Sequence, residues 1–535
     1  MKLRESNIQH LKDEVFDVLV IGGGINGAVT AAALSTRGVR VAMIDRGDFA
    51  GGTSQESSNL AWGGIKYMES GEYRLVRSLC KSRNQLMREY PSTVQEIRFL
   101  TTIARGFRWH PVVLWMGTWL YWFIGMGQTA RPRILSRRAI AAEAPMVDTR
   151  EAVGGFEYSD AFLYDNDARF VFDFVRSALS NGCIAANYVE SQGAECVNGV
   201  WQVKAHNMIG GDDFTMQAKV LVNAAGAWLD GHNQTANLAT EYRHLLSKGI
   251  HLIVDQIGDV QRVLTFFADD GRLFFAIPMG TRTCVGTTDT RVDSLEVHVT
   301  NEDQQFVLDN INRRLRLAKP LTAADVISRR CGVRPLAIKG EVADEIDFLQ
   351  LSRKHIIEID KERPHLSIFG GKLTDCINVG EEVCELIEGF GIKLPFPNRK
   401  WYGEPSASVR EEFEHQARLM NLDAMTAPES SEPLTCRLWR RYGAQAIGLL
   451  ENIREDKSQA EVLIKGTEYT RCELRQASRR EMIVKLEDFL RRRSKIALVE
   501  RKEVIREAPG LMEACEILFG ADAQQRFDEY FSAEK

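Results

Sequence analysis

The sequence predicts an α/β protein, α+β in overall content, that begins with a Rossmann-like unit and ends in a helical domain. Residues 16–21 and 39–44 are short apolar runs typical of buried strands, and the alanine-rich segment 25–36 between them is typical of a helix. After about Pro397 the chain becomes highly charged and helical in character, most clearly at 437–453 and 475–498. We therefore expect one large region at 1–395 and a C-terminal helical domain at 396–535.

Further strands are predicted within the large region. Residues 219–222 form an apolar run that enters a tight turn, and regular strands with turn signals are expected at 273–278 and 284–288. A chain of 535 residues is too long for a single ordinary core, so two or three domains with a cleft between them are expected.

Composition excludes several classes of function. The chain has 68 Lys and Arg against 73 Asp and Glu, a formal net charge of -5, which gives no electrostatic case for nucleic-acid binding. Its 10 cysteines show no CxxC pair or zinc-like cluster, so we interpret them as reduced thiols and expect no metal site. Residues 1–14 lack the apolar segment of a secretory signal, and a cytoplasmic location is expected.

One stretch departs from the pattern of soluble proteins. Residues 111–127 hold no charged side chain, and Trp115, Trp119 and Trp122 share one face of the expected helix. Basic residues flank the stretch at Arg105, Arg108, His110, Arg131 and Arg133. It is short for a membrane crossing, which needs roughly 20 residues. Two interpretations remain open: a buried core helix, or a surface element at the inner face of the cell membrane, where tryptophan and basic flanks are favoured.

A glycine motif carries the chemistry of the N-terminal unit. Gly22, Gly24 and Gly27 give G-x-G-x-x-G between a strand and a helix, and Asp45 ends the second strand. The glycines permit a tight turn, close approach of a pyrophosphate to the backbone and close packing of helix on strand. The acid is expected to accept a hydrogen bond from a ribose hydroxyl. The motif predicts a dinucleotide but does not distinguish FAD from NAD.

Motifs distributed over nearly the whole chain resemble the FAD-dependent glycerol-3-phosphate dehydrogenase family. They include Ile21-Gly22-Gly23-Gly24-Ile25-Asn26-Gly27-Ala28, Thr53-Ser54, Gly155-Phe156-Glu157-Tyr158-Ser159-Asp160, Val222-Asn223-Ala224-Ala225-Gly226-Ala227-Trp228, Gly332-Val333-Arg334-Pro335-Leu336, Phe369-Gly370-Gly371-Lys372-Leu373-Thr374 and Arg492-Arg493-Ser494-Lys495. The resemblance implies an FAD-binding domain, a substrate domain with an antiparallel sheet and a C-terminal helical domain. It also implies oxidation of sn-glycerol 3-phosphate to dihydroxyacetone phosphate, with electrons passed through FAD to a quinone or, in oxidase members, to oxygen.

The same resemblance implies roles for individual residues. Positions matched to FAD contacts are Gly22, Gly24, Asn26, Gly27, Asp45, Thr53, Ser54, Ala225, Gly226, Gly371, Lys372, Leu373 and Thr374. Arg334 and Arg353 match positions that grip the substrate phosphate, for which a guanidinium fork is suited. Lys66 and Tyr67 are also expected to bind substrate, Lys372 to stabilise negative charge on the reduced flavin, and His251 to accept a proton. Arg334 is expected to act in catalysis as well. A homodimer is compatible with the sequence.

One segment departs from the family pattern. Where the family reads Lys-Leu-Ile-His-Gly-Gly-Leu-Arg-Tyr, this chain has Asn59, Trp62 and Lys66 in place of the lysine, the histidine and the arginine. Lys66 keeps the charge but loses the bidentate fork, and Trp62 is unable to relay a proton. Two alternatives therefore stay open: an FAD oxidase or dehydrogenase that acts on another polyol phosphate or an amine, and a degenerate flavin-binding regulatory protein.

Overall fold

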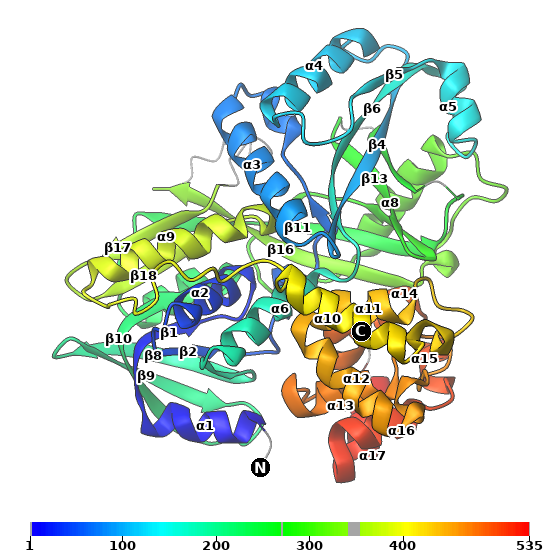
Figure 1. The fold of residues 1–535 in the computed structure, drawn as a ribbon. Coiled ribbons are helices and arrows are strands. Elements are labelled where there is room, and N and C mark those ends of the chain that lie inside the picture. Colours follow the sequence, from blue (N-terminus) through cyan, green and yellow to red (C-terminus); the bar gives the residue numbers. More distant parts are fainter. Residues whose placement is uncertain (1–2, 260, 269–270, 341–353, 534–535) are drawn as a thin grey trace.

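The computed structural model describes residues 3–259, 261–268, 271–340 and 354–533. In this part of the chain two large sheets lie side by side, and a helical domain packs against them (Figure 1). The predicted α/β fold, with a Rossmann-like unit, an antiparallel sheet and a C-terminal helical domain, is confirmed.

The first sheet is the predicted Rossmann-like unit. Its strands are β1 (Val15–Ile21), β2 (Val41–Ile44), β7 (Ile184–Ala186), β8 (Val189–Val197), β9 (Val200–Asn207), β10 (Asp213–Asn223), β17 (Ile356–Asp360) and β18 (His365–Phe369). The central path runs β18-β10-β1-β2-β7 with every neighbour parallel, which is why these strands read as continuous apolar runs.

Helices cover one face of this sheet. Val18, Val20 and Val222 pack against α2 (Ile25–Thr36), α6 (Asp167–Ser180) and α9 (Cys376–Gly389). The opposite face packs against α1 (Leu3–Asp13) and the antiparallel pair β8 and β9. The carboxyl ends of β1 and β10 therefore meet beside the start of α2, where parallel sheets of this kind bind their ligands.

The second sheet is largely antiparallel. Its strands are β3 (Leu60–Ala61), β4 (Val94–Ala104), β5 (Arg133–Leu135), β6 (Ala152–Leu163), β11 (Tyr242–Asp255), β12 (Arg262–Phe267), β13 (Leu273–Met279), β14 (Arg282–Gly286), β15 (Thr290–Val292) and β16 (Ser328–Lys339). Alternate side chains face opposite cores, as the twofold period of a strand requires. Leu252 packs towards α8 (Asn301–Arg314), whereas Ile253 packs in the core beneath α3 (Tyr73–Glu89).

The C-terminal helices have cores of their own. They are α10 (Ala407–Leu419), α11 (Leu434–Tyr442), α12 (Ala446–Glu455), α13 (Arg471–Arg480), α14 (Ile496–Val499), α15 (Lys502–Glu507), α16 (Leu511–Phe519) and α17 (Ala523–Ser532), with a π-helical turn, η10 (Asp488–Arg493). The two segments expected to be helical are each divided into shorter helices. Gly443 at φ 52° ends α11, and Met482 at φ 50° lies between α13 and η10, so neither run continues.

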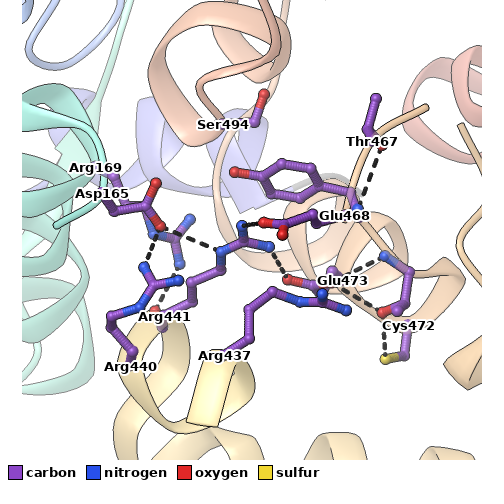
Figure 2. A network of polar contacts seen from close by, with 12 residues as sticks. Asp165, Arg169, Arg437, Arg440, Arg441, Thr467, Glu468, Cys472, Glu473 and Ser494 are labelled. Carbon is purple, nitrogen blue, oxygen red and sulfur yellow. Dashed lines mark hydrogen bonds and ion pairs between the residues drawn. The ribbon is translucent and has the colours of Figure 1, made fainter. Parts of the chain in front are cut away.

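Buried ion pairs join this domain to the first sheet (Figure 2). Arg440 and Arg441 of α11 both bind Asp165, which precedes α6, and Arg441 also donates to Glu473 at 2.8 Å. Arg169 on α6 binds Glu481 at 2.8 Å. Charges buried in this way are stable only while both partners stay in place.

The charge-free stretch forms α4 (Pro111–Ile124) and ends three residues short of its expected end at residue 127. Trp115, Trp119 and Trp122 contact one another edge to face, so they share a side of the helix as predicted. All three are half-buried, however, and the exposed side chains are Val112, Val113, Met116, Leu120 and Phe123. The tryptophans are therefore partly covered by neighbouring side chains, and membrane contact of this stretch stays a prediction. Among the described residues, no helix combines the length and apolar character that a membrane crossing requires.

Candidate functional site

A cavity of about 970 Å³ opens between the two sheets. The turn after β1, the loop that follows β2, the end of β10 and the segment after β18 line one part of it. Strands β11, β13 and β16 line the other part. Segments far apart in the sequence therefore contribute to one elongated site.

The glycine turn has the shape that a pyrophosphate requires. Gly22 has φ 99°, and a side chain at Gly27 would place its Cβ 1.8 Å from the carbonyl oxygen of Gly22. A Cβ at Gly24 would meet only Ser54 Oγ, at 3.3 Å. Gly24, the N-cap residue of α2, has no side chain with which to cap the helix. The helix N-terminus therefore faces a space where a phosphate fits and a side chain would intrude.

Asp45 lies at the end of β2 and lines the cavity. Its Oδ2 accepts the N–H of Gly23 at 2.7 Å, and its Oδ1 accepts the N–H of Gly47 at 2.8 Å. Burial raises the pKa of this carboxyl to about 6, although both backbone hydrogen bonds oppose the shift. Each oxygen keeps acceptor capacity, so a ribose hydroxyl has a suitable partner here.

Two loops complete the predicted cofactor wall. Ser54 Oγ accepts the N–H of Ile25 at 3.0 Å, and Thr53 donates to the carbonyl of Val333 at 2.6 Å. Asn26 on α2 donates to the carbonyl of Gly370 at 3.0 Å and thereby holds the segment after β18. The remaining positions predicted for the cofactor that line the cavity are Ala225, Gly226, Gly371, Lys372, Leu373 and Thr374.

Several cations line the cavity. Lys372 Nζ lies 4.2 Å from the centre of the Tyr67 ring, and Lys66 lines the same wall. Trp62 lies there too, with its Nε1 donating to the Tyr158 hydroxyl at 3.3 Å. The indole thus stands in the aromatic wall of the cavity.

Arg334 on β16 lines the cavity as well. Its guanidinium donates to Thr287 Oγ1 at 3.0 Å and lies 3.3 Å from Asp289 Oδ1. It also lies so close to Gly249 on β11 that a Cβ there would fall 2.2 Å from Nη2. The absence of a side chain at Gly249 therefore fixes where Arg334 lies.

His251 on β11 lies in the cavity wall and is 2% exposed. Burial first, and then the charges of Arg334 and Arg330, lower the pKa of this imidazole well below its usual range. Within the described part of the chain its Nδ1 has no hydrogen-bond partner. The histidine is therefore neutral near pH 7, with Nδ1 buried.

Among the described positions, Gly27 and Asn59 are absent from the cavity lining. Arg353 lies outside the described residues. Asn59, which replaces the family's lysine, is buried away from the cavity lining, where it donates to the carbonyl of Asp165 at 2.8 Å and accepts from Arg330 at 3.2 Å. Its φ of 57° suits asparagine, which tolerates the left-handed region. This departure from the family therefore serves the fold near the site.

Sequence reasoning missed several lining residues. Arg272 at the start of β13 lines the cavity and lies 3.4 Å from the carbonyl oxygen of Asp289. Tyr188 lies between β7 and β8, and Lys485 and Arg492 come from the C-terminal domain. Of these only Arg492 fell within a matched motif, Arg492-Arg493-Ser494-Lys495, and that motif was not connected with the cofactor because its position in space was unknown.

Two family models match the sequence. Residues 17–360 match the family described as FAD dependent oxidoreductase, which is more than half of the chain. Residues 408–526 match the C-terminal domain of alpha-glycerophosphate oxidase. Among curated relatives, an aerobic glycerol-3-phosphate dehydrogenase from Staphylococcus aureus (strain USA300) is 28% identical over 518 residues, 94% of this chain and 90% of that protein.

Solved structures share the fold. A glycerol-3-phosphate dehydrogenase from Bacillus halodurans complexed with FAD superposes with a TM-score of 0.74 at 24% identity, over 99% of this chain and 96% of that one. An L-alpha-glycerophosphate oxidase from Mycoplasma pneumoniae with FAD bound gives 0.56 at 18% identity, over 74% of this chain and 99% of that one. The predicted resemblance and the predicted cofactor, FAD, are thereby confirmed.

Proposed function

Since the chain belongs to the family of FAD dependent oxidoreductases, we propose that it oxidises sn-glycerol 3-phosphate to dihydroxyacetone phosphate. The observation that carries this proposal is the set of cations that line the cavity. Lys66, Arg272, Arg334 and Lys372 all line it. Of the neighbouring acids, Asp289 is engaged by Ser247 as well as by Arg334. Guanidinium and ammonium groups of this kind suit a phosphate better than an amine.

FAD, held around Gly24 and Asp45, would supply the acceptor for the hydride that leaves C2 of the substrate. Arg334 grips the phosphate, and its fixed contacts with Thr287 and Asp289 orient the fork before the substrate arrives. Lys372, held against Tyr67, supplies positive charge beside the reacting centre. Arg353 is proposed to assist at the phosphate on the basis of the resemblance alone.

His251 is proposed to take the proton of the C2 hydroxyl. Its lowered pKa keeps the imidazole neutral and able to accept, and Nδ1 has no partner among the described residues. A dianionic phosphate beside Arg334 would offset the charges that depress this pKa, so substrate binding itself is expected to strengthen the base.

A second candidate substrate class follows from Trp62. The indole occupies the position of the family's histidine in the cavity wall, where it meets Phe275 edge to face with ring centroids 6.4 Å apart. A larger apolar wall alters the space next to the cations. This favours another polyol phosphate as the alternative, since the cations remain. A purely regulatory protein has less support, because His251, Arg334 and Lys372 are all present at the cavity.

An anaerobic titration tests both candidates. The holoprotein is mixed with sn-glycerol 3-phosphate, with other polyol phosphates and with sarcosine-like amines, and flavin bleaching is followed. Bleaching by glycerol 3-phosphate in preference to the others supports the first proposal. Bleaching by another phosphate alone supports the second, and bleaching only by amines contradicts both.

The electron acceptor is proposed to be a quinone reached from the cytoplasmic face of the cell membrane. The support is α4, whose exposed side carries apolar residues at Val112, Val113, Met116, Leu120 and Phe123. Arg105 and Arg108 precede the helix, and Arg131 and Arg133 follow it. Reoxidation of the reduced enzyme by a quinone analogue, compared with oxygen, tests this choice. Faster reoxidation by oxygen would assign the protein to the oxidases.

A further inference from the structure

Three consecutive arginines of the C-terminal domain, Arg491, Arg492 and Arg493, form ion pairs with the cavity loop 48–56. Arg491 Nη2 donates to both carboxylate oxygens of Glu56, at 2.7 and 2.9 Å. Arg492 Nε donates to Asp48 at 2.7 Å, and Arg493 donates to both oxygens of Asp48 at 2.7 and 2.8 Å. The arginines lie in the π-helical turn η10, a geometry often found at functional sites. The loop is therefore held at both of its ends.

The loop in question, residues 48–56, is the wall that faces the glycine turn. It carries Thr53 and Ser54, and Ser54 Oγ binds the backbone of Ile25 at the first turn of α2. A displacement of this loop would change the space left for the pyrophosphate at Gly24. The contacts of η10 therefore act on cofactor geometry through residues 48–56.

The C-terminal domain also contributes to the cavity wall near Asp45. With the pyrophosphate at Gly24 and the ribose at Asp45, the space beyond Asp45 is left for the adenosine. The cavity lining that contains Gly24 and Asp45 also contains Tyr188, Lys485 and Arg492. Lys485 Nζ lies 4.9 Å from the centre of the Tyr188 ring. The C-terminal domain thus contributes to the adenosine wall.

Tyr188 is held in place by contacts with several segments of the chain. Its φ of 54° is unfavourable for a bulky side chain and persists only where the surroundings enforce it. Its hydroxyl donates to Asp488 at 2.7 Å, its N–H donates to Gly47, and its carbonyl accepts from Arg4. One of these restraints comes from the C-terminal domain.

We propose that the C-terminal helical domain is part of the FAD site: residues 485–493 fix the loop 48–56 and close the adenosine end of the cavity. FAD binding and docking of this domain then stabilise each other by the same factor, as thermodynamic linkage requires. The inference does not depend on which substrate the enzyme oxidises.

Conservative variants test the contacts in the full-length protein. Tyr188→Phe removes the bond to Asp488, Lys485→Ala removes an exposed side chain, and Arg492→Lys keeps the charge but loses the fork. Each is expected to weaken FAD binding by roughly threefold to tenfold, the scale of one hydrogen bond or cation–π contact. FAD released on dilution is measured by its fluorescence. Unchanged affinity in Tyr188→Phe and Lys485→Ala would overturn the proposal even if Arg492→Lys fails to fold.

A matched control separates positioning of the loop from general stability. Arg169→Lys weakens a buried ion pair with Glu481 between the same two domains, but Arg169 does not line the cavity. It is expected to lower the Tm with a smaller loss of FAD affinity than Arg492→Lys. An equal loss of FAD in both variants would assign the effect to overall stability and contradict the proposal.

Hydrogen exchange tests the reciprocal effect. Addition of FAD to the full-length apoprotein is expected to slow exchange of the amides in residues 485–494, which belong to the C-terminal domain. The helix α17, whose residues are absent from the cavity lining, serves as the internal reference. Equal exchange of residues 485–494 with and without FAD would show that the domain is not coupled to the cofactor.

Discussion

Lys372 Nζ lies 4.2 Å from the centre of the Tyr67 ring, so a cation of one motif rests on an aromatic ring of another. Lys372 belongs to a segment that matches the family, whereas Tyr67 is the last residue of the segment that departs from it. The altered positions Trp62 and Lys66 line the same cavity as Lys372, the cation proposed for catalysis. Substrate choice and charge stabilisation are therefore expected to respond to the same side chains.

Replacement of this lysine tests its proposed role. Lys372→Met keeps the length of the side chain and removes the charge beside the reacting centre. We expect the rate of flavin bleaching by substrate to fall by roughly 100-fold or more, the scale of one lost electrostatic stabiliser. Stopped-flow absorbance under anaerobic conditions measures it. A normal bleaching rate in a variant with full FAD content would remove Lys372 from catalysis.

Arg334 is expected to act on the substrate and not on FAD. Arg334→Ala should lower kcat/KM by roughly tenfold to 1000-fold, since a charge-assisted pair to phosphate is lost. Arg334→Lys should recover only part of this loss, because an ammonium does not reproduce the fork. The flavin spectrum should be retained in both variants. Unchanged kinetics in Arg334→Ala would place the phosphate elsewhere.

The glycine turn offers a test of cofactor binding alone. A side chain at Gly24 would enter the space in front of α2 without meeting the backbone, so Gly24→Val is expected to fold and to purify without FAD. Gly448→Ala on α12, where a Cβ meets nothing within 4 Å, is the control and should keep full FAD content. Normal FAD content in Gly24→Val would contradict the assigned path of the pyrophosphate.

The sequence predicted local elements better than the contacts between distant ones. The helix at residues 25–36 and the strand beginning at Leu273 were correct because apolar period and turn residues are local signals. The roles of Tyr188 and Arg492 were not predictable, because each depends on pairing across hundreds of residues. The helix α4 illustrates a second limit: apolar composition on both of its faces does not show which side packs on β6.

A buried histidine predicts a pH dependence of stability. His355 binds Asp375 at 2.7 Å and Glu382 at 2.9 Å. Burial lowers the pKa of this imidazole, but its bonds to the two carboxylates outweigh burial and raise it to about 9. A raised histidine pKa stabilises the folded state fully below the unfolded value of about 6.5, and the benefit is lost as the pH rises through about 9.

The Tm should therefore fall between about pH 6.5 and 9, by a contribution of up to about 3 kcal/mol from this group. His355→Gln keeps a hydrogen-bonding side chain but does not titrate, so its Tm should be lower at pH 6.5 and should change less across the same interval. Differential scanning calorimetry of both proteins measures the difference. Parallel Tm profiles would exclude His355 as the cause.

The last prediction concerns the apolar side of α4. Met116, Leu120 and Phe123 are 54%, 46% and 65% exposed, whereas the three tryptophans are half-buried. If this side lies in the membrane interface, Met116→Ser, Leu120→Ser and Phe123→Ser together should release the protein from anionic liposomes while leaving FAD content unchanged. Trp115→Ser should instead lower the Tm, because its ring packs in the core beneath α3. Cosedimentation with liposomes measures the first effect. Equal binding of the wild-type protein and the triple variant would show that α4 does not contact the lipid and would remove the support for a quinone acceptor.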